Sequence, residues 1–283
     1  MSQQLEQKTQ SLLEIPISEW TFLCDLYADR KCETMSYSLI SHFLKWVQFE
    51  PNLDIKCLSL DESWRKDGTF LIIGALGNKQ KDVYFDTLSD NMDRLSQLLE
   101  CFTIDPKDIM LFGYSKRVVP AAERYIRKFP NTPFTTIATV LYRASPDIIA
   151  GFSTDPPAGL ELRRLAIEDA ETVNALWPHR TEGSVNFVKR LITHHLSVGA
   201  YDANGRMVSW CLREPIGRVG MLQVQESQKR LGLGSLMVRY ISKKIMEQGE
   251  EVLAAVVLEN VASSKMFEKL GFKQIDNVYW TYY

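Results

Sequence analysis

Two glycines separated by one residue follow a basic pair in the second half of the chain, a spacing that could bind phosphate. The segment begins with Lys229–Arg230 and continues through Gly232 and Gly234 to Ser235. Apolar residues then recur at helical spacing, which predicts a helix over about residues 232–248. The first amides of a helix have no intrahelical partners, and with the helix dipole they attract anions. Because glycine lacks a Cβ, a diphosphate can approach this backbone closely.

Two common phosphate-loop motifs do not fit this segment. A Walker loop ends in Gly-Lys-Ser/Thr, whereas Gly234 is followed by Ser235 and Leu236. A dinucleotide-binding fingerprint has a third glycine at the position that Met237 occupies. Taken alone, the two glycines also fit an ordinary turn before a helix.

Neighbouring residues resemble a third family. Leu-x-Val at residues 222–224 precedes Lys229, Gly232 and Gly234, and Glu-Lys-Leu-Gly-Phe follows at residues 268–272. This pattern resembles the Gcn5-related N-acetyltransferase (GNAT) superfamily. That family has Arg/Gln-x-x-Gly-x-Gly/Ala after its fourth strand, an asparagine after the fifth, and an aromatic residue seven positions later. The last two positions are Asn260 and Phe267, and the resemblance covers about residues 160–283.

The resemblance implies an acetyl-CoA or other acyl-CoA co-substrate and no metal. Its pantetheine arm would lie between the fourth and fifth strands, and its diphosphate on the glycine loop. An amide near Val224 would stabilise the oxyanion of the thioester. Asn260 would meet the arm from the fifth strand, although it could equally cap the following helix. The implied cofactor-binding residues are Leu222, Gln223, Val224, Lys229, Arg230, Leu231, Gly232, Leu233, Gly234, Ser235, Asn260, Ser263 and Phe267.

Phe267 departs from the family pattern. Most members have a tyrosine there that protonates the leaving thiolate, and phenylalanine cannot donate a proton. Because a thiol has a pKa of about 8.5, a thiolate can leave without help, and general acid catalysis is worth about 10²–10⁴-fold. We therefore expect a slower transferase. Lys229 in place of Arg or Gln is a smaller departure, since backbone amides carry most of the binding.

The attacking amine needs a general base, and Glu226 just beyond the fourth strand is the first candidate. The alternative for Glu226 is a solvated loop carboxylate, and Glu214 is a second candidate. His179 could face the acceptor, whereas the histidine pair 194–195 is expected to stabilise a helix end. Cys211 lies on a predicted strand as a core residue, so direct attack without an acyl-enzyme is predicted.

A narrower resemblance indicates the acceptor. Trp177, Ser-Val-Asn-Phe at 184–187, Val-Gly-Ala at 198–200 and Val-Ser-Trp at 208–210 are similar to glycine N-acyltransferases. This implies transfer to a small-molecule amine such as glycine or another amino acid, and a divergent, fold-related N-terminal domain. The alternatives are acetylation of a protein amine and acyl-CoA binding without catalysis.

The elements that position these residues follow from periodicity. A polar run with two prolines at residues 153–159 divides the chain into predicted domains 1–152 and 153–283. In the second half the predicted order is β-α-α-β-β-β-α-β-α-β, with the Asn204-Gly205 turn leading into a strand at residues 207–213. A further strand is expected at residues 218–224, and the last strand around residues 278–282. This order predicts an α/β fold with a mixed, mostly antiparallel sheet and helices on both faces.

The first half also predicts mixed α/β structure but carries no catalytic motif. Helices are expected at residues 36–49, 90–101 and 118–129, and strands at 70–76, 82–85 and 135–142, with a turn at Gly77-Asn78. The helix-hairpin-helix order is compatible with a second, degenerate GNAT-like copy.

Composition excludes several classes of function. The 283 residues carry a net charge of −2, which gives no electrostatic case for binding nucleic acid or an anionic membrane. Five cysteines and four histidines show no metal-binding spacing. The first fifteen residues lack the apolar core of a signal peptide, so a cytoplasmic location or an organelle lumen is expected. The sequence leaves the oligomeric state open.

Overall fold

The computed structural model describes residues 11–31, 33–77 and 79–283. The turn predicted at Gly77-Asn78 and Cys32 therefore lie partly or wholly outside the described residues. The first half contains β1 (Leu13–Ile15), α1 (Trp20–Leu26), α2 (Ser36–Phe49), β2 (Ile55–Ser59), α3 (Trp64–Asp67), β3 (Phe70–Gly74), β4 (Lys81–Asp86), α4 (Asp93–Cys101), β5 (Ile109–Ser115), α5 (Val119–Arg127), β6 (Thr135–Ala144) and α6 (Pro146–Ala150).

The second half repeats this order of elements. It contains β7 (Leu160–Arg163), α7 (Ala170–Leu176), α8 (Ser184–His194), β8 (Ser197–Asp202), β9 (Met207–Arg213), β10 (Arg218–Val224), α9 (Leu233–Glu247), β11 (Val252–Val257), α10 (Val261–Lys269) and β12 (Lys273–Tyr282). Apart from the short helices α3 and α6, both halves follow β-α-α-β-β-β-α-β-α-β. The prediction that the first half is a second copy of the same fold is confirmed.

One continuous sheet joins the two halves. Its order is β1-β2-β3-β4-β5-β12-β6-β11-β10-β9-β8-β7. Only the pairs β4–β5 and β10–β11 are parallel among the described strands, and the other neighbours are antiparallel. The predicted mixed, mostly antiparallel sheet is therefore confirmed.

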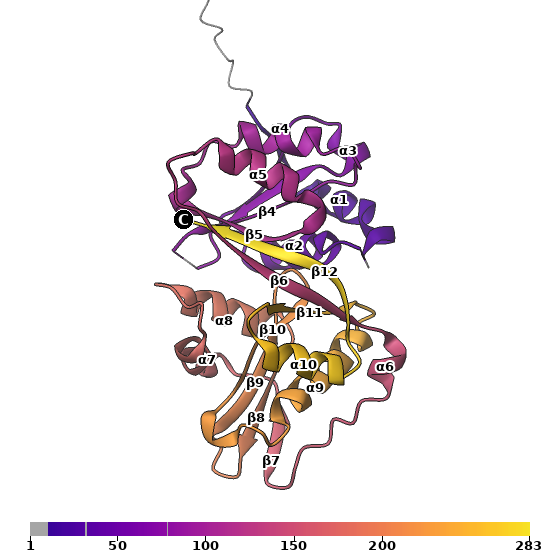
Figure 1. The fold of residues 1–283 in the computed structure, drawn as a ribbon, viewed down its shortest axis with the longest axis vertical. Helices are drawn as coiled ribbons and strands as arrows, with labels where there is room; N and C mark the ends of the chain where they lie inside the picture. Colours follow the sequence, from indigo (N-terminus) through magenta and orange to yellow (C-terminus); the bar gives the residue numbers. More distant parts are fainter. Residues whose placement is uncertain (1–10, 32, 78) are drawn as a thin grey trace, which may run out of the picture.

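The last strand of each half lies in the other half's part of the sheet. The first half's β6 pairs with β11, and the second half's β12 pairs with β5. The two exchanged strands also pair with each other, from Lys273↔Arg143 to Tyr282↔Thr135. Figure 1 shows them side by side between the upper, first half and the lower, second half. The division at residues 152/153 stays a prediction, since the sheet crosses it without a break.

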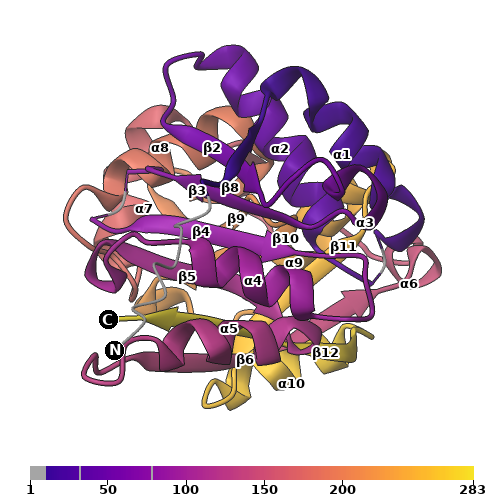
Figure 2. The same ribbon diagram turned by 90° about the horizontal axis from the view of Figure 1, so that it is seen from above.

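Three clusters of buried side chains cover the sheet. Helices α1, α2, α7 and α8 contribute to one core that spans both halves and includes Trp20, Phe43, Phe187 and Trp210. On the opposite face, α4 and α5 cover the first half, and α9 and α10 cover the second. Figure 2 shows α1, α2 and α8 on one side of the sheet and α4, α5 and α10 on the other. The two halves thus share a core as well as a sheet.

Buried polar contacts also join the halves. Trp46 Nε1 of the first half donates to His195 Nε2 of the second at 2.8 Å, and within the second half Arg213 forms an ion pair with Glu250 at 2.6 Å. His42 Nε2 lies 3.6 Å from the same Glu250 carboxylate. Burial lowers the pKa of both His42 and His195, which favours the neutral imidazoles in the folded protein.

Candidate functional site

The central feature of the second half is a gap between the neighbouring strands β10 and β11. These strands pair only at Arg218↔Leu253 and Val219↔Ala254 among the described residues. Beyond these pairs β10 continues beside β9 to Val224↔Ser209, while β11 continues beside β6 to Val257↔Thr139. The two strands therefore separate, and each presents one backbone edge to the space between them.

A β-bulge sets the direction of β10 at the start of this gap. The register between β10 and β9 shifts between Gly220 and Gln223, and Met221 within the bulge has a φ of 48°. Among the described residues, Met221 and Arg230 are the non-glycine residues with positive φ. Arg230 lies in the segment that the sequence associated with acyl-CoA, and Met221 directly precedes it. Strained backbone of this kind clusters at functional sites.

The bulge leaves two peptide groups of β10 facing the gap. Gln225 N donates to Val208 O on β9 at 2.9 Å, so Gln225 and, two residues earlier, Gln223 direct their backbone groups toward β9. Backbone groups alternate in direction along a strand. The N–H and C=O groups of Leu222 and Val224 therefore face the gap, where they can bind the amides and the carbonyl of an extended ligand.

Helix α9 begins beside this exposed edge. Gly232 is its N-cap residue with a φ of 79°, and no side chain of the described residues caps the helix. Leu236 N donates to Gly232 O, so the amides of Leu233, Gly234 and Ser235 have no intrahelical acceptor. These amides are available to an anion.

The two glycines play different parts in this site. A Cβ built on Gly234 would lie 3.6 Å from Val224 Cγ2, so the helix start contacts the gap-facing strand. At Gly232 a Cβ would meet nothing within 4 Å, which leaves open space before the helix. A ligand with a diphosphate at α9 and an extended arm along β10 fits this arrangement.

The loop before α9 places its charges in solvent. Glu226 lies on the short 3₁₀-helix η6 (Glu226–Gln228), its side chain is 87% exposed, and it forms an ion pair with Lys229 at 2.6 Å. Arg230 and Leu231 are also exposed. Glu226 therefore has the surroundings of a solvated loop carboxylate, and its role as a general base stays a prediction.

Asn260 and Phe267 lie on the β11 side of the gap. Asn260 Oδ1 accepts from Ser263 N at 3.1 Å and caps α10. This is the capping contact that the sequence offered as an alternative, and contact with a pantetheine arm stays a prediction. Phe267 is buried, and its ring packs edge-on against Phe272 at 5.1 Å.

Tyr142, which no sequence motif indicated, lies beside Phe267 and comes from the first half. It lies on β6 opposite Ala254 of β11, and its ring stacks on Phe267 with the centroids 6.0 Å apart. Tyr142 Oη donates to Glu268 Oε1 at 3.2 Å, so its hydroxyl is already engaged on α10. The pairing of β6 with β11 brings Tyr142 to Phe267. No local sequence pattern indicates this pairing.

On the sheet face opposite α9, the connection between α7 and α8 carries an aromatic group. Trp177 stacks on Phe187 with the centroids 6.1 Å apart, and the exposed His179 lies beside Trp177 at 6.3 Å. Trp177 and Met221 of the bulge pack against the same core cluster. The connection between α7 and α8 therefore lies on the sheet face opposite α9.

The remaining candidates lie elsewhere. Glu214 is buried and paired with Arg218, at the closed end of β10. His194 pairs with Glu50 at 2.7 Å, and His195 accepts from Trp46, so both serve contacts between the halves. Burial raises the pKa of the Cys211 thiol, which does not suit a nucleophile.

Neither a membrane span nor a metal cluster is found in the described part of the chain. No helix within residues 11–31, 33–77 and 79–283 is long and apolar enough to cross a bilayer. In the same ranges no three His, Cys, Asp or Glu side chains are grouped so that they could hold a metal ion.

Comparison with known proteins supports the assignment of the fold. Residues 197–281 match the family model described as FR47-like protein, and no curated protein matches the sequence. A solved structure of a Drosophila protein is 22% identical, with a TM-score of 0.85 over 96% of this chain and 97% of its own.

Two further solved structures carry the family name. A tandem GNAT protein from the clavulanic acid biosynthesis pathway is 14% identical, with a TM-score of 0.59 over 96% of this chain and 97% of its own. A GCN5-related N-acetyltransferase from Sphaerobacter thermophilus is 11% identical, with a TM-score of 0.54 over 97% of this chain and 95% of its own. The chain therefore has the fold of the Gcn5-related N-acetyltransferases, present in two copies.

Proposed function

We propose that the protein is an acyl-CoA-dependent N-acyltransferase whose active site is the gap between β10 and β11. The observation that carries the proposal is the juxtaposition of two unsatisfied backbone surfaces. The amides of Leu233 to Ser235 suit the diphosphate of coenzyme A, and the backbone of Leu222 and Val224 suits its pantetheine arm. A Cβ built on Gly234 would lie 3.6 Å from Val224 Cγ2, which supports a single continuous site.

The chemistry would be direct attack of an amine on the thioester carbonyl. A C–N bond forms, the C–S bond breaks, and the coenzyme A thiolate takes a proton from solvent. The gap-facing amide of Val224 would donate to the developing oxyanion, a contact typically worth about 3–4 kcal/mol. The proton of the amine would pass to water, with Glu226 as the nearest predicted base. The buried Cys211 argues against an acyl-enzyme intermediate.

We infer that the acceptor is a small amine such as glycine or another amino acid. Two of the residues similar to glycine N-acyltransferases, Trp177 and Phe187, stack on each other on the sheet face opposite α9, which supports an acceptor entrance on that face. An amine entering from this face would meet the thioester opposite α9. The acyl group would contact the same aromatic surface.

A non-catalytic acyl-CoA-binding protein is the second candidate, and two observations favour it. Phe267 offers no proton to the leaving thiolate, and Tyr142 beside it already donates to Glu268. The predicted base Glu226 is exposed and paired with Lys229. Such a site would hold acyl-CoA with slow or no turnover.

The test is calorimetric binding of acetyl-CoA and benzoyl-CoA, followed by thiol release with a panel of amino acids. Saturable binding with release that depends on the amine is the expected result. Binding without release across the amino acids and a panel of peptides would favour the non-catalytic candidate. Release with peptides alone would make the protein a protein acetyltransferase, and no binding would contradict both candidates.

A further inference from the structure

The first half contains an equivalent gap. Strands β4 and β5 pair in parallel from Lys81↔Ile109 to Val83↔Leu111 and then separate, as β10 and β11 do. The end of β4 at Asp86 and the turn into α4 occupy the places that the end of β10 and the glycine loop occupy in the second half. The repeated fold therefore presents two candidate slots for acyl-CoA, the gap between β4 and β5 (the first slot) and the gap between β10 and β11 (the second slot).

The loop into α4 offers fewer free amides than the start of α9 does. Asp93 N donates to Asn91 Oδ1 at 2.7 Å, Asn91 N to Ser89 Oγ at 3.2 Å, and Ser89 N to Thr87 Oγ1 at 3.2 Å. Residues 87–92 contain no glycine. Each of these amides thus has an acceptor within the loop, and the acidic Asp93 opens the helix where a diphosphate would bind.

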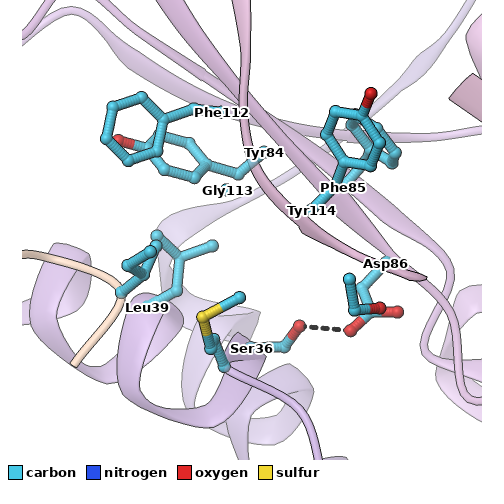
Figure 3. A pocket seen from close by; sticks show the side chains of 11 residues that line it. Ser36, Leu39, Tyr84, Phe85, Asp86, Phe112, Gly113 and Tyr114 are labelled. Carbon is cyan, nitrogen blue, oxygen red and sulfur yellow. Dashed lines mark hydrogen bonds between the residues drawn. The ribbon is translucent and has the colours of Figure 1, made fainter. Parts of the chain in front are cut away.

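A buried ion pair closes the end of this first slot. The Asp86 side chain is 8% exposed and pairs with Arg117 at 2.5 Å. Arg117 also donates to the backbone oxygens of Thr87 and of Ser89. Ser36 Oγ donates to Asp86 Oδ2 at 2.6 Å, as Figure 3 shows. The guanidinium and the hydroxyl satisfy the groups that would otherwise face a ligand.

The second half fills what remains of the first slot. Ile216, in the turn between β9 and β10, lines the cavity together with Phe112 and Gly113 of β5. A Cβ on Gly113 would lie 2.9 Å from Ile216 Cδ1. The volume left is about 20 Å³, enough for one water molecule and too small for a pantetheine arm.

The same turn is held by α2 on either side of Ile216. His42 Nδ1 donates to Pro215 O at 2.8 Å. Gly217 lies against Ser38, where a Cβ would approach the serine Cβ to 2.6 Å. The turn that leads into β10 is thus fixed by three consecutive residues in contact with the first half.

We propose that the gap of the first half is a socket for the β9–β10 turn, and that the chain binds a single acyl-CoA, in the second half. The single site rests on the proposed function. Ile216 and the Arg117–Asp86 pair occupy the place that a ligand would take in the first-half gap. The contact with Ile216 also anchors the start of β10, the strand that carries the proposed acyl-CoA site.

The experiment is calorimetric titration of the full chain with acetyl-CoA, read as stoichiometry. Gly234→Trp places an indole at the start of α9, and Gly151→Trp, at an exposed glycine without positive φ, is its matched control. We expect one site in the wild-type protein and in Gly151→Trp, and at least a tenfold loss of affinity in Gly234→Trp. Circular dichroism confirms that each variant is folded.

A third variant tests the socket itself. Ile216→Ala removes the side chain that fills the first slot, and we expect it to lower the melting temperature while the stoichiometry stays at one. Two sites in the wild-type protein, a residual site in Gly234→Trp, or a second site gained by Ile216→Ala would overturn the single-site proposal while leaving acyl-CoA binding intact. No binding by the wild-type protein would instead refute the proposed function, and the single site with it.

Discussion

At the scale of single residues, the site depends on backbone conformations that few side chains adopt. Met221 and Arg230 both have positive φ, at 48° and 65°, and they bracket the strand end that faces the gap. Such conformations cost about 1–3 kcal/mol each and persist where the surroundings enforce them. Here the bulge turns Leu222 and Val224 toward the gap, which gives the strain a direct consequence for binding.

Phe267 is the residue at which the chemistry can be tuned. We expect Phe267→Tyr to raise kcat about tenfold or more while the affinity for acyl-CoA changes little, because a phenol there could protonate the thiolate. Thiol release under saturating acetyl-CoA measures the effect. Phe272→Tyr adds a hydroxyl to the neighbouring buried ring and serves as the control. Equal rates in both variants and the wild-type protein would show that proton donation at this position does not limit turnover.

At the scale of elements, the exchanged strands make each half dependent on the other. Strand β11 pairs with β6 along six consecutive residues from Val252 to Val257, and β12 lies between two strands of the first half. Tyr142 brings a first-half ring against Phe267. Separating the two halves would remove β6 and Tyr142, and with them one side of the proposed acyl-CoA site.

We therefore expect the two fragments of a chain cleaved in its connecting loop to remain associated. A protease site inserted between Pro156 and Pro157, both exposed, should yield fragments that co-elute in gel filtration and still bind acetyl-CoA with the affinity of the uncut chain. Residues 153–283 expressed alone should lack cooperative unfolding, because β11 loses its partner β6 and β12 loses both β5 and β6. A folded, acyl-CoA-binding fragment 153–283 would contradict this account of the exchange.

The sequence predicted the elements around the site closely and the connections between the halves poorly. Strands β9 and β10 have the predicted bounds, and α9 differs by one residue at each end, because alternation, the Asn204-Gly205 turn and the apolar stripe are local signals. The last strand was predicted from Val278, yet it begins at Lys273. Pairing with β6 extends it through a polar stretch that periodicity alone does not mark as a strand.

Long-range pairing explains the other misses. Strand β5 was not predicted, although Phe112 and Tyr114 on it pack into two different cores. The gap, the bulge at Met221 and the contact of Tyr142 with Phe267 also depend on which strands lie side by side. The spacing of apolar residues predicts where a helix or strand lies. It does not predict which strands pair, because tertiary packing decides that choice.

At the scale of the whole molecule, two buried neutral histidines join the halves and tie stability to pH. Burial lowers the pKa of His42 and His195 in the folded state, so the unfolded chain binds more protons below its ordinary histidine pKa of about 6.5. The contribution of these two histidines to the free energy of unfolding is therefore fully present above about pH 6.5 and is lost as the pH falls below it. The loss is at most about 1.4 kcal/mol per pH unit for each histidine.

Urea unfolding at pH 7.5, 6.5 and 5.5 measures this dependence. We expect His195→Gln, which keeps an acceptor for Trp46, to reduce the slope between pH 6.5 and 5.5. The exposed His179→Gln should leave the slope as it is in the wild-type protein. A wild-type stability that rises on acidification through this range would mean that the buried histidines are charged in the folded state.

The most direct test of the acyl-CoA site is calorimetric binding of acetyl-CoA to Ser235→Asp and to Thr172→Asp. Both changes place a carboxylate at the third position of a helix, α9 and α7 respectively, where negative charge favours folding. Only the first carboxylate would meet the diphosphate. We expect at least a tenfold loss of affinity for Ser235→Asp and none for Thr172→Asp, whereas equal affinity in both variants would place the acyl-CoA site elsewhere.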